Sequence, residues 1–278
     1  MPDEWFPAPA KLNLFLHVVG RRADGYHLLE TAFRFIDFGD ALAFQCRADG
    51  VVRRATELPE VDPENDLCVK AARLLQEATR CRMGADIRLI KRIPMGGGLG
   101  GGSSDAATTL MVLNRLWGTG LKRADLQALG LRLGADVPVF VFGRSAFAQG
   151  IGEQLQACEF APAWYVVLVP EAYVSTAEIF TAPELTRNTN AIRIAPFSPD
   201  QGHNDLEPVV CRRYPQVALC LAWLRRHGPA RMTGSGACVF VSVADEAQAK
   251  RIVASLPEGM KGFAARGLDR HPMWSDGD

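Results

Sequence analysis

Apolar and polar residues alternate in the first strand-like stretch of the chain. Every second residue from 12 to 18 is apolar, which is the period of a β-strand with one face in the core. The same period places Lys11 and Asn13 together on the opposite face. A lysine at such a place usually keeps an exposed edge strand from aggregating, and this is the ordinary interpretation of Lys11 taken alone.

Strand and helix patterns follow each other through the rest of the first half. Residues 30–38 and 41–47 have the pattern of two strands, and Gly39-Asp40 between them predicts a hairpin turn. Residues 65–78 carry one apolar stripe, which predicts an amphipathic helix. The other predicted elements are a strand at residues 87–93 and helices over residues 106–117 and 122–133.

The pattern starts again beyond Gly152. The predicted elements are a strand at residues 164–169, helices over 205–213 and 217–227, a strand at 238–243, a helix over 245–255 and a strand at 262–266. Strands and helices interleaved in this order predict a compact α+β unit. We therefore expect two domains, residues 1–155 and residues 156–278, and a frayed tail over residues 269–278.

Composition narrows the class of protein. The chain has 278 residues, of which 48% are hydrophobic, as in a globular protein with a real core. Lys+Arg and Asp+Glu are both 31, so no overall field favours nucleic acid or an anionic membrane. The seven cysteines show no CxxC pair or metal-binding spacing, which indicates reduced thiols in the cytoplasm. We expect no secretory signal and no membrane span, because no apolar run approaches about 18 residues.

A glycine-rich stretch follows the strand predicted at residues 87–93. Six of the seven residues from 96 to 102 are glycine, and Ser103 and Ser104 then provide caps for the next helix. A glycine loop that enters a helix N-terminus exposes backbone N–H groups to the positive end of the helix dipole. Polyphosphate is the ligand that this pattern favours. A flexible linker or a buried turn is the alternative.

Two common nucleotide motifs do not fit this loop. The usual P-loop ends in Gly-Lys-Ser/Thr, whereas Gly102 is followed directly by Ser103. A GxGxxG match is present, but any run of glycines contains one. The residues near position 121 also lack the strand that would end in an acidic residue for a ribose.

Asp136 is the single carboxylate in an otherwise apolar segment, residues 135–142. Burying an uncompensated carboxylate is costly, so the residue needs a structural or a chemical reason. One interpretation is an N-cap for a short helix that begins at Val137. The other is a partner lysine that reaches it from the strand of Lys11.

Two other short motifs are ambiguous by themselves. Tyr26-His27 lies in a glycine-bounded loop, where an aromatic ring beside an imidazole suits a planar ligand but also ordinary loop packing. Residues 232–237 form a second turn of small residues before a predicted strand.

Taken together, these motifs resemble the GHMP kinase superfamily. Its hallmark is the loop of the type Pro-x-x-x-Gly-Leu-Gly-x-x-Ser-Ser, here residues 94–104. Within the superfamily the chain is most similar to the 4-diphosphocytidyl-2-C-methyl-D-erythritol kinase family. The matching motifs are Pro9-Ala10-Lys11-Leu12-Asn13-Leu14, Asp24-Gly25-Tyr26-His27, Gly134-Ala135-Asp136-Val137-Pro138 and Gly234-Ser235-Gly236. They extend over nearly the whole chain, from residue 9 to about residue 266.

The resemblance implies a fold and an activity. The fold would be α+β with two domains, an N-terminal ribosomal-protein-S5-domain-2-like domain and a C-terminal ferredoxin-like domain, with the active site in the cleft between them. The enzymes of this family use ATP to phosphorylate the 2-hydroxyl of 4-diphosphocytidyl-2-C-methyl-D-erythritol, in the non-mevalonate pathway to isoprenoid precursors. Mg²⁺ is expected with ATP, and its ligands stay open. The only partners expected are these small molecules, with a monomer or weak dimer in the cytoplasm.

The resemblance also implies a role for individual residues. Asp136 would accept the proton of the substrate hydroxyl, with Lys11 beside it. The loop around the ATP phosphates would comprise Pro94, Met95, Gly96, Gly97, Gly98, Leu99, Gly100, Gly101, Gly102, Ser103 and Ser104, with Asn65 and Lys91 near the adenosine. The substrate-binding residues would be Asn13, Tyr26, His27, Thr176 and Phe180.

Two alternatives remain. A kinase of the same superfamily that acts on another small alcohol would keep the loop and Asp136 but change the Tyr26, His27 and Phe180 set. A nucleotide-binding sensor without activity would keep the loop and lose the base. The presence of both Lys11 and Asp136 speaks against the sensor.

Overall fold

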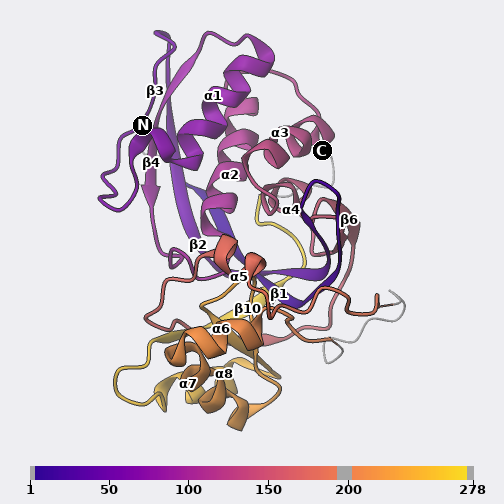
Figure 1. Cartoon of the computed structure of the whole chain (residues 1–278). Helices are drawn as coiled ribbons and strands as arrows, with labels where there is room; N and C mark the ends of the chain where they lie inside the picture. The colour runs from indigo at the N-terminus through magenta and orange to yellow at the C-terminus, as the bar shows by residue number, and fades with distance from the viewer. Residues whose placement is uncertain (1–3, 193–201, 274–278) are drawn as a thin grey trace.

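Two long antiparallel strands, β1 (Phe6–Arg21) and β2 (His27–Arg47), form the centre of the fold (Figure 1). The computed structural model describes residues 4–192 and 202–273. Residues 8–18 of β1 are buried on both faces, including Lys11 and Asn13. The interpretation of Lys11 as the charge of an exposed edge strand is therefore wrong. The alternation does mark the two faces of β1, but each face is covered by another part of the chain.

β2 is one continuous strand, so the hairpin predicted at Gly39-Asp40 is wrong. The pairing of β1 with β2 shifts there: Pro9 faces Gly39, whereas Ala10 faces Ile36. Residues 37–38 form a bulge that bends the strand without reversing it. A Cβ at Gly39 would lie 2.5 Å from the facing backbone of β1. Glycine is required for this close approach. Because glycine is also typical of turns, the local pattern predicts a turn here.

The strands form one continuous sheet that crosses both halves of the chain. Its order is β3–β4–β2–β10–β7–β9–β8, with β1 paired to β2 and β5 paired to both β2 and β6. The bounds are β3 Val52–Arg54, β4 Gly84–Ile90, β5 Ala146–Gln149, β6 Gln154–Ala157, β7 Trp164–Leu168, β8 Arg231–Met232, β9 Val239–Val243 and β10 Gly262–Leu268. All pairs are antiparallel except β3 with β4.

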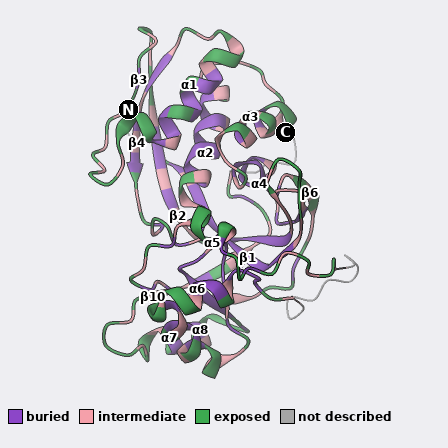
Figure 2. Ribbon diagram, viewed as in Figure 1, coloured by how far each residue is buried: buried purple, intermediate pink, exposed green. Residues whose placement is uncertain are grey.

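The helices of the first half pack together beside β1, β2 and β4 (Figure 1). They are α1 (Leu67–Thr79), α2 (Gly101–Leu116), α3 (Arg123–Leu133) and α4 (Val137–Phe142), with a 3₁₀ turn at Pro63–Asn65 before α1. Figure 2 shows α2 buried along much of its length. The predicted helices are confirmed, but Ser103 and Ser104 are not the caps of α2. That helix already begins at Gly101, because the N-cap Gly100 accepts a φ of 74°.

The second half has the predicted strands and helices. Its helices are α5 (Thr176–Thr181), α6 (Glu207–Arg213), α7 (Pro215–Leu224), a 3₁₀ turn at Arg225–His227 and α8 (Glu246–Ala254). β10 leaves this half and pairs with β2 at Gly267 and Leu268. The predicted frayed tail is wrong for residues 269–273, since His271 is 2% exposed. Residues 274–278 lie outside the described residues.

Three hydrophobic clusters hold these layers together. One lies under the helices of the first half, and another fills the second half and extends to Leu16 and Val18 of β1. The third joins the halves, because it packs Leu12 and Phe15 of β1 against Val167 of β7 and Phe240 of β9. The junction is thus built from apolar side chains of both halves and fixes the geometry of the space between them.

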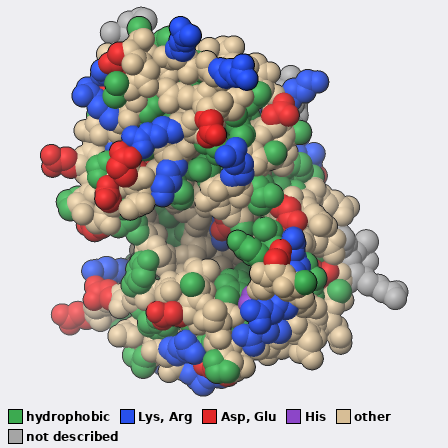
Figure 3. Space-filling view, turned by 45° about the horizontal axis from the view of Figure 1, so that its top comes forward, with side chains coloured by type: hydrophobic (Ala, Val, Ile, Leu, Met, Phe, Trp, Pro, Cys, Tyr) green, Lys and Arg blue, Asp and Glu red, His purple; other side chains and the backbone are tan. Residues whose placement is uncertain are grey.

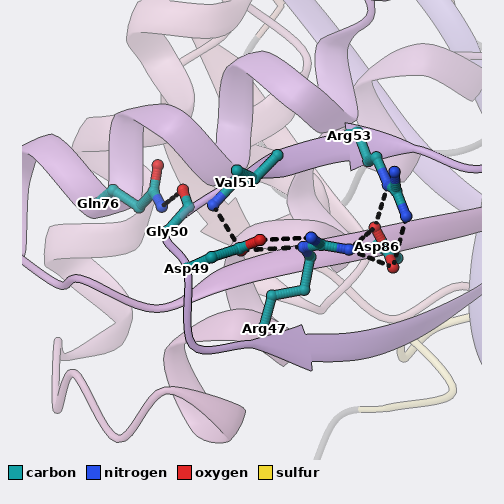
Figure 4. A network of polar contacts seen from close by, with 7 residues as sticks. All are labelled: Arg47, Asp49, Gly50, Val51, Arg53, Gln76 and Asp86. Carbon is teal, nitrogen blue, oxygen red and sulfur yellow. Dashed lines mark hydrogen bonds and ion pairs between the residues drawn. The ribbon is translucent and has the colours of Figure 1, made fainter.

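A polar network secures the far end of β2, away from that junction (Figure 4). Asp86 of β4 accepts from Arg47 Nη1 at 3.1 Å and from Arg53 Nε at 2.6 Å. Arg47 also pairs with Asp49. The hydrogen bond from Arg53 is the main reason why the pKa of Asp86 is lowered. Exposed pairs of this kind contribute little each, and their effect here is to order the turn that leads to β3.

Candidate active site

A cavity of about 550 Å³ opens between the two halves of the fold. Figure 3 shows the surface hollowed between the upper and lower parts of the molecule. The cavity walls come from β1, from the segment between β4 and α2, from the start of α4, and from the turn at residues 234–236. Segments that are far apart in the sequence thus meet around one space.

The glycine loop, residues 94–104, forms one wall of this cavity. Gly96, Gly98 and Gly100 have φ angles of 67°, 73° and 74°, in the region where any other residue is strained. α2 starts at Gly101, so its first N–H groups and the positive end of its dipole lie at the cavity wall. This is the geometry of an anion site.

Close contacts with the second half fix the glycine loop. The carbonyl oxygen of Gly96 accepts a hydrogen bond from Ala237 N at 3.2 Å. A Cβ at Gly98 would lie 2.2 Å from the carbonyl oxygen of Thr233, and a Cβ at Gly234 would lie 2.9 Å from that of Gly98. The two glycine turns therefore pack backbone against backbone. The loop is a fixed turn and not a flexible linker.

Lys11 of β1 lies beneath the glycine loop and is 2% exposed. Its Nζ donates to Asn13 Oδ1 at 2.5 Å and to the carbonyl oxygen of Gly98 at 3.1 Å. Its backbone N donates to the carbonyl oxygen of Leu99 at 3.0 Å. The same Nζ lies 3.1 Å from Asp136 Oδ2. One ammonium group therefore connects the glycine loop to the carboxylate.

Asp136 directly precedes α4, but its side chain makes no capping hydrogen bond. Asp136 therefore occupies the N-cap position of α4, as one interpretation predicted, but its carboxylate pairs with Lys11 and does not cap the helix. Its side chain is 34% exposed and lines the cavity. Partial hydration and a paired cation remove most of the cost of placing a carboxylate in apolar surroundings. Asp136 is thus a charged group that a ligand in the cavity can reach.

Lys91 lies behind the start of α2, between two buried carboxylates. Its Nζ lies 2.5 Å from Asp40 Oδ2 and 2.6 Å from Asp105 Oδ2. Asp40 Oδ1 also accepts from the backbone N of Ile93 at 2.8 Å, which anchors the chain just before the glycine loop. Burial, together with the charge of Asp40, raises the pKa of Asp105 to about 8 although Lys91 opposes the shift. This group holds the base of the loop and carries a carboxyl that titrates near neutral pH.

A second group of predicted residues, Tyr26, His27, Thr176 and Phe180, is called the outer rim below. Thr176 and Phe180 line the cavity. The rings of His27 and Phe180 lie 5.2 Å apart between centroids. Tyr26 is 62% exposed and does not line the cavity, and neither does His27.

Arg187 holds two members of the outer rim. Its Nε donates to His27 Nε2 at 3.1 Å, and its Nη2 donates to the carbonyl oxygen of Phe180 at 3.1 Å. Burial and the charge of Arg187 lower the pKa of His27. A neutral imidazole that accepts at Nε2 carries its proton on Nδ1. His27 therefore offers a single, defined donor.

The structure brings most of the predicted site residues around one cavity. Those that line it are Lys11, Asn13, Asn65, Lys91, Pro94, Met95, Gly96, Gly97, Gly98, Leu99, Gly100, Gly101, Gly102, Ser103, Asp136, Thr176 and Phe180. Ser104 is fully buried behind this wall. Sequence reasoning missed Thr233, Asp105, Asp40 and Arg187. Asp105 directly follows Ser104 within an apolar helix, and that isolated charge was the only available signal.

The oxygen atoms present suit a hard cation that arrives with a polyphosphate. Among the described residues no group of three or more His, Cys, Asp or Glu side chains could hold a metal ion. Ser104 Oγ and Asp105 Oδ1 are buried and have no hydrogen-bond partner in the described part of the chain. Mg²⁺ prefers oxygen ligands and is commonly held by substrate phosphates, waters and one or two protein oxygens. The donor set therefore fits a cation held mainly by phosphate rather than by a protein cage.

Comparison with known proteins agrees with this geometry. The family model "GHMP kinases N terminal domain" matches residues 66–144, and "GHMP kinases C terminal" matches residues 184–262. A mevalonate kinase structure superposes with a TM-score of 0.69 at 15% identity, over 96% of this chain and all of that chain. At this identity the likeness shows the fold alone. The glycine loop and the two-part fold define a small-molecule kinase of the GHMP class.

Proteins with higher sequence identity to this chain identify one family within the GHMP class. The chain is 62% identical to a 4-diphosphocytidyl-2-C-methyl-D-erythritol kinase of Aromatoleum aromaticum, over 96% of this chain and 94% of that protein. It is 63% identical to the kinase of the same name from Thiobacillus denitrificans, over 97% of each. A crystal structure of a 4-(cytidine 5'-diphospho)-2C-methyl-D-erythritol kinase superposes with a TM-score of 0.81 at 32% identity, over 95% of this chain and 99% of that chain. The chain belongs to the 4-diphosphocytidyl-2-C-methyl-D-erythritol kinase family. Within the described residues no helix has the length and apolar content needed to span a membrane.

Proposed function

We propose that this protein transfers the γ-phosphoryl group of ATP to the 2-hydroxyl of 4-diphosphocytidyl-2-C-methyl-D-erythritol, a step in the non-mevalonate route to isoprenoid precursors. The observation that carries the proposal is the pair formed by Lys11 and Asp136, 3.1 Å apart in the cavity that the glycine loop also lines. A polyphosphate site and an accessible carboxylate with a fixed cation are the two parts that phosphoryl transfer to an alcohol requires.

Asp136 accepts the proton of the acceptor hydroxyl as the new P–O bond forms. An alcohol has a high pKa, and a positioned carboxylate that takes its proton typically accelerates such a step by about 10²–10⁴-fold. Lys11 pairs with Asp136 and reduces the charge that develops on the attacking oxygen. Because Lys11 is held by Asn13 and Gly98, its position changes little during the reaction.

The nucleotide binds along the glycine loop, residues 94–104. Its phosphates accept hydrogen bonds from the backbone N–H groups at the start of α2, with Lys91 and Asn65 near the adenosine. Both of these side chains line the cavity, and Asn65 Oδ1 accepts from Lys70 Nζ at 3.2 Å. Mg²⁺ bound with ATP neutralises charge on the transferred phosphoryl group. Asp105, which lines the cavity, and Ser104, which is buried behind the cavity wall, would supply protein oxygens for it.

The outer rim binds the cytosine of the acceptor. His27 reads the edge of the base with its Nδ1–H, while Phe180 and Tyr26 stack on its faces. The exposure of Tyr26 supports a closing motion in which its ring covers the base once the substrate is bound. Asn13 and Thr176 contact the polyol and diphosphate part.

Three broader features complete the proposal. The chain divides into domains at residues 1–155 and 156–278, and it acts as a monomer or weak dimer on small molecules rather than on nucleic acid. All seven cysteines are free thiols, which supports a place in the reducing cytoplasm.

Release of ADP by the purified protein tests the acceptor. We expect rapid ADP release with 4-diphosphocytidyl-2-C-methyl-D-erythritol and less than about 1% of that rate with mevalonate or homoserine, because neither alcohol offers a base to the outer rim. Comparable rates with mevalonate or homoserine would identify a GHMP kinase for a different alcohol. No release with any member of the panel, despite ATP binding, would support a nucleotide sensor.

A further inference from the structure

A second cavity of about 750 Å³ lies at the opposite end of α2 and α4 from the active site. α2 begins in the glycine loop, and its last turns supply Met111 and Arg115 to this second cavity. α4 begins beside Asp136, and Val141 in its last turn lines the same space. A helix of 16 residues is about 24 Å long. The second cavity is therefore separate from the site of phosphoryl transfer.

The polar lining of the second cavity carries one sign of charge. Arg115, Lys122 and Arg123 line it, and none of its described lining residues is Asp or Glu. Two acidic groups adjoin this lining and offset part of its charge, and Arg123 Nη1 already donates to the carbonyl oxygen of Phe142 at 3.1 Å. Glu4 pairs with Arg115 at 3.6 Å, and Asp125 accepts from the backbone N of Lys122 at 3.0 Å.

The N-terminus of α3 adds to this positive character. Its first two residues, Arg123 and Ala124, line the second cavity. The first N–H groups of a helix have no partner within the helix and face outward with the positive end of its dipole. A helix end alone does not make a site, but here it meets three cationic side chains and a buried imidazole.

His271 is that imidazole, and it has an unused donor. The residue is 2% exposed and lines the second cavity. Burial, aided by the charge of Arg123, lowers the pKa of His271 to about 3, so the ring is neutral. Its Nδ1 accepts from the backbone N of Met273 at 3.1 Å, which places the proton on Nε2. Among the described residues that Nε2 has no hydrogen-bond partner, and leaving a buried donor unpaired is unfavourable.

The remaining wall is mainly apolar. Its large apolar residues are Met111, Val112, Leu121, Leu126, Val141 and Met273. Asn114 also lines the cavity, but its side chain already bonds to Thr119 and Leu121. An inorganic anion would leave this wall uncovered, whereas a neutral apolar molecule would leave the cations unused. The lining requires both features in one ligand.

We infer that the second cavity is a binding site for a small organic phosphate, an anionic group joined to a compact apolar body. The phosphate contacts Arg115, Lys122 and the start of α3, and the apolar body covers the Met111 and Leu126 wall. An occupant of this site touches the last turns of both helices that begin at the active site.

Phenyl phosphate is a suitable probe, and isothermal titration calorimetry measures its binding to the full chain. A saturating, non-hydrolysable ATP analogue is present throughout, so that the glycine loop is already filled. We expect one saturable site per chain. Inorganic phosphate and benzyl alcohol should each bind at least tenfold more weakly, because each satisfies only one part of the lining.

Variants separate this site from adventitious binding. Ala124→Trp fills the second cavity from an exposed position and should abolish binding, whereas Ala128→Trp, at an exposed position of the same helix outside the cavity, should leave binding unchanged. The combined Arg115→Ala and Lys122→Ala change should weaken binding roughly tenfold or more, since charge-assisted hydrogen bonds are lost.

Three results would overturn the inference. The first is the absence of saturable binding to the unmodified chain. The second is binding that Ala124→Trp leaves unchanged, which would place phenyl phosphate elsewhere on the surface. The third is binding that appears only after residues 274–278 are deleted, because the occupant of the cavity would then be the chain's own end. Failure of the proposed kinase activity would leave all three measurements unaffected.

Discussion

The glycine-loop side of the active site and the outer rim are built in different ways. On the glycine-loop side, backbone contacts between two glycine turns and the buried Lys11 hold the loop backbone in place before a ligand arrives. On the outer rim, Tyr26 is 62% exposed. The hydroxyl of Thr176 forms a hydrogen bond with that of Ser235, with 2.7 Å between the two oxygens. Arg187 orders His27 and Phe180, whereas no side chain among the described residues forms a hydrogen bond with the Tyr26 hydroxyl.

This difference indicates how binding energy is used. Preorganised donors and charges stabilise a transition state without reorganising during the reaction. Side chains that become ordered only when the substrate binds lower the net affinity through lost conformational freedom, but they supply contacts remote from the transferred group. We therefore expect changes on the glycine-loop side to affect the chemical step and nucleotide use, and changes on the outer rim to affect acceptor affinity.

The largest effect is expected at Asp136. Asp136→Asn keeps the size of the side chain but removes the proton acceptor, so the rate of phosphoryl transfer should fall about 10²–10⁴-fold. Nucleotide affinity should stay within about threefold, because the glycine loop is untouched. Rapid-quench single-turnover measurements give the rate of the chemical step directly. A rate within threefold of the unmodified enzyme would remove Asp136 from its role as base.

A smaller effect is expected at the glycine loop itself. Gly98→Ala introduces a Cβ 2.2 Å from the carbonyl oxygen of Thr233 at a φ of 73°. The displaced backbone donors should lower kcat/KM for ATP about 10²-fold, the typical cost of losing one preorganised donor. Valine at Gly98 or Gly101 should raise the KM for ATP further.

Gly259→Ala is the matched control for Gly98→Ala. Gly259 has a similar φ of 82°, but a Cβ there meets no atom within 4 Å. It should lower stability by about 1–2 kcal/mol through backbone strain alone and leave kcat/KM for ATP unchanged. Equal kinetic losses in the two variants would show that strain, and not contact with the second turn, explains the need for glycine.

On the outer rim, Phe180→Ala and Tyr26→Ala should each weaken acceptor binding roughly 5- to 150-fold, as expected for about 1–3 kcal/mol of base stacking. Binding of an ATP analogue should hardly change. Replacing cytosine by uracil in the acceptor should also weaken binding, because the edge-reading donor and acceptor groups no longer match. Calorimetry with both ligands measures each effect. Equal losses for the acceptor and the ATP analogue would contradict the division between the two sides.

The smallest effect is a change in the pH dependence of stability at Asp105. The pKa of Asp105 is about 8 in the folded chain and near 3.8 as an ordinary carboxyl. The folded state therefore binds the extra proton between these values, and stability is lost as the pH rises from about 4 to 8. Above pH 8 both states are ionised and the loss is complete.

Asp105→Asn removes this titration. Relative to the unmodified chain, the free energy of unfolding of the variant should rise between pH 5 and pH 8 by at least about 1.4 kcal/mol, the equivalent of one pKa unit. Urea unfolding across this pH range measures the difference. A difference that does not change with pH would show that Asp105 is ionised throughout, held so by Lys91.

Local patterns predicted the parts of the site that depend on backbone chemistry. The sequence predicted the glycine loop, the strand of Lys11 and the start of α4 at Asp136, because each of these residue types is required at its position. The order of the strands and helices in the second half could also be predicted, because each element has its own apolar period.

Features that depend on contacts between residues far apart in the sequence could not be predicted. Gly39 looks like a turn residue, and only the approach of β1 shows that it permits a bulge. Both faces of β1 are covered by segments far away in sequence, so the alternation around Lys11 could not show its burial. Arg187 carries no local signal at all, because its importance comes from His27, 160 residues earlier.

Identification of the phosphorylated product tests the central claim most directly. As the name of the acceptor states, its carbon 2 carries a methyl group, so the 2-hydroxyl is attached to a carbon without hydrogen. Proton-coupled ³¹P nuclear magnetic resonance of a reaction with ATP and 4-diphosphocytidyl-2-C-methyl-D-erythritol should show a new phosphomonoester signal without three-bond splitting by hydrogen. The signal should be absent when Asp136→Asn replaces the unmodified enzyme over the same time. A new signal split by one or two hydrogens would place the phosphoryl group on another hydroxyl and contradict the account, as would no new phosphomonoester at all.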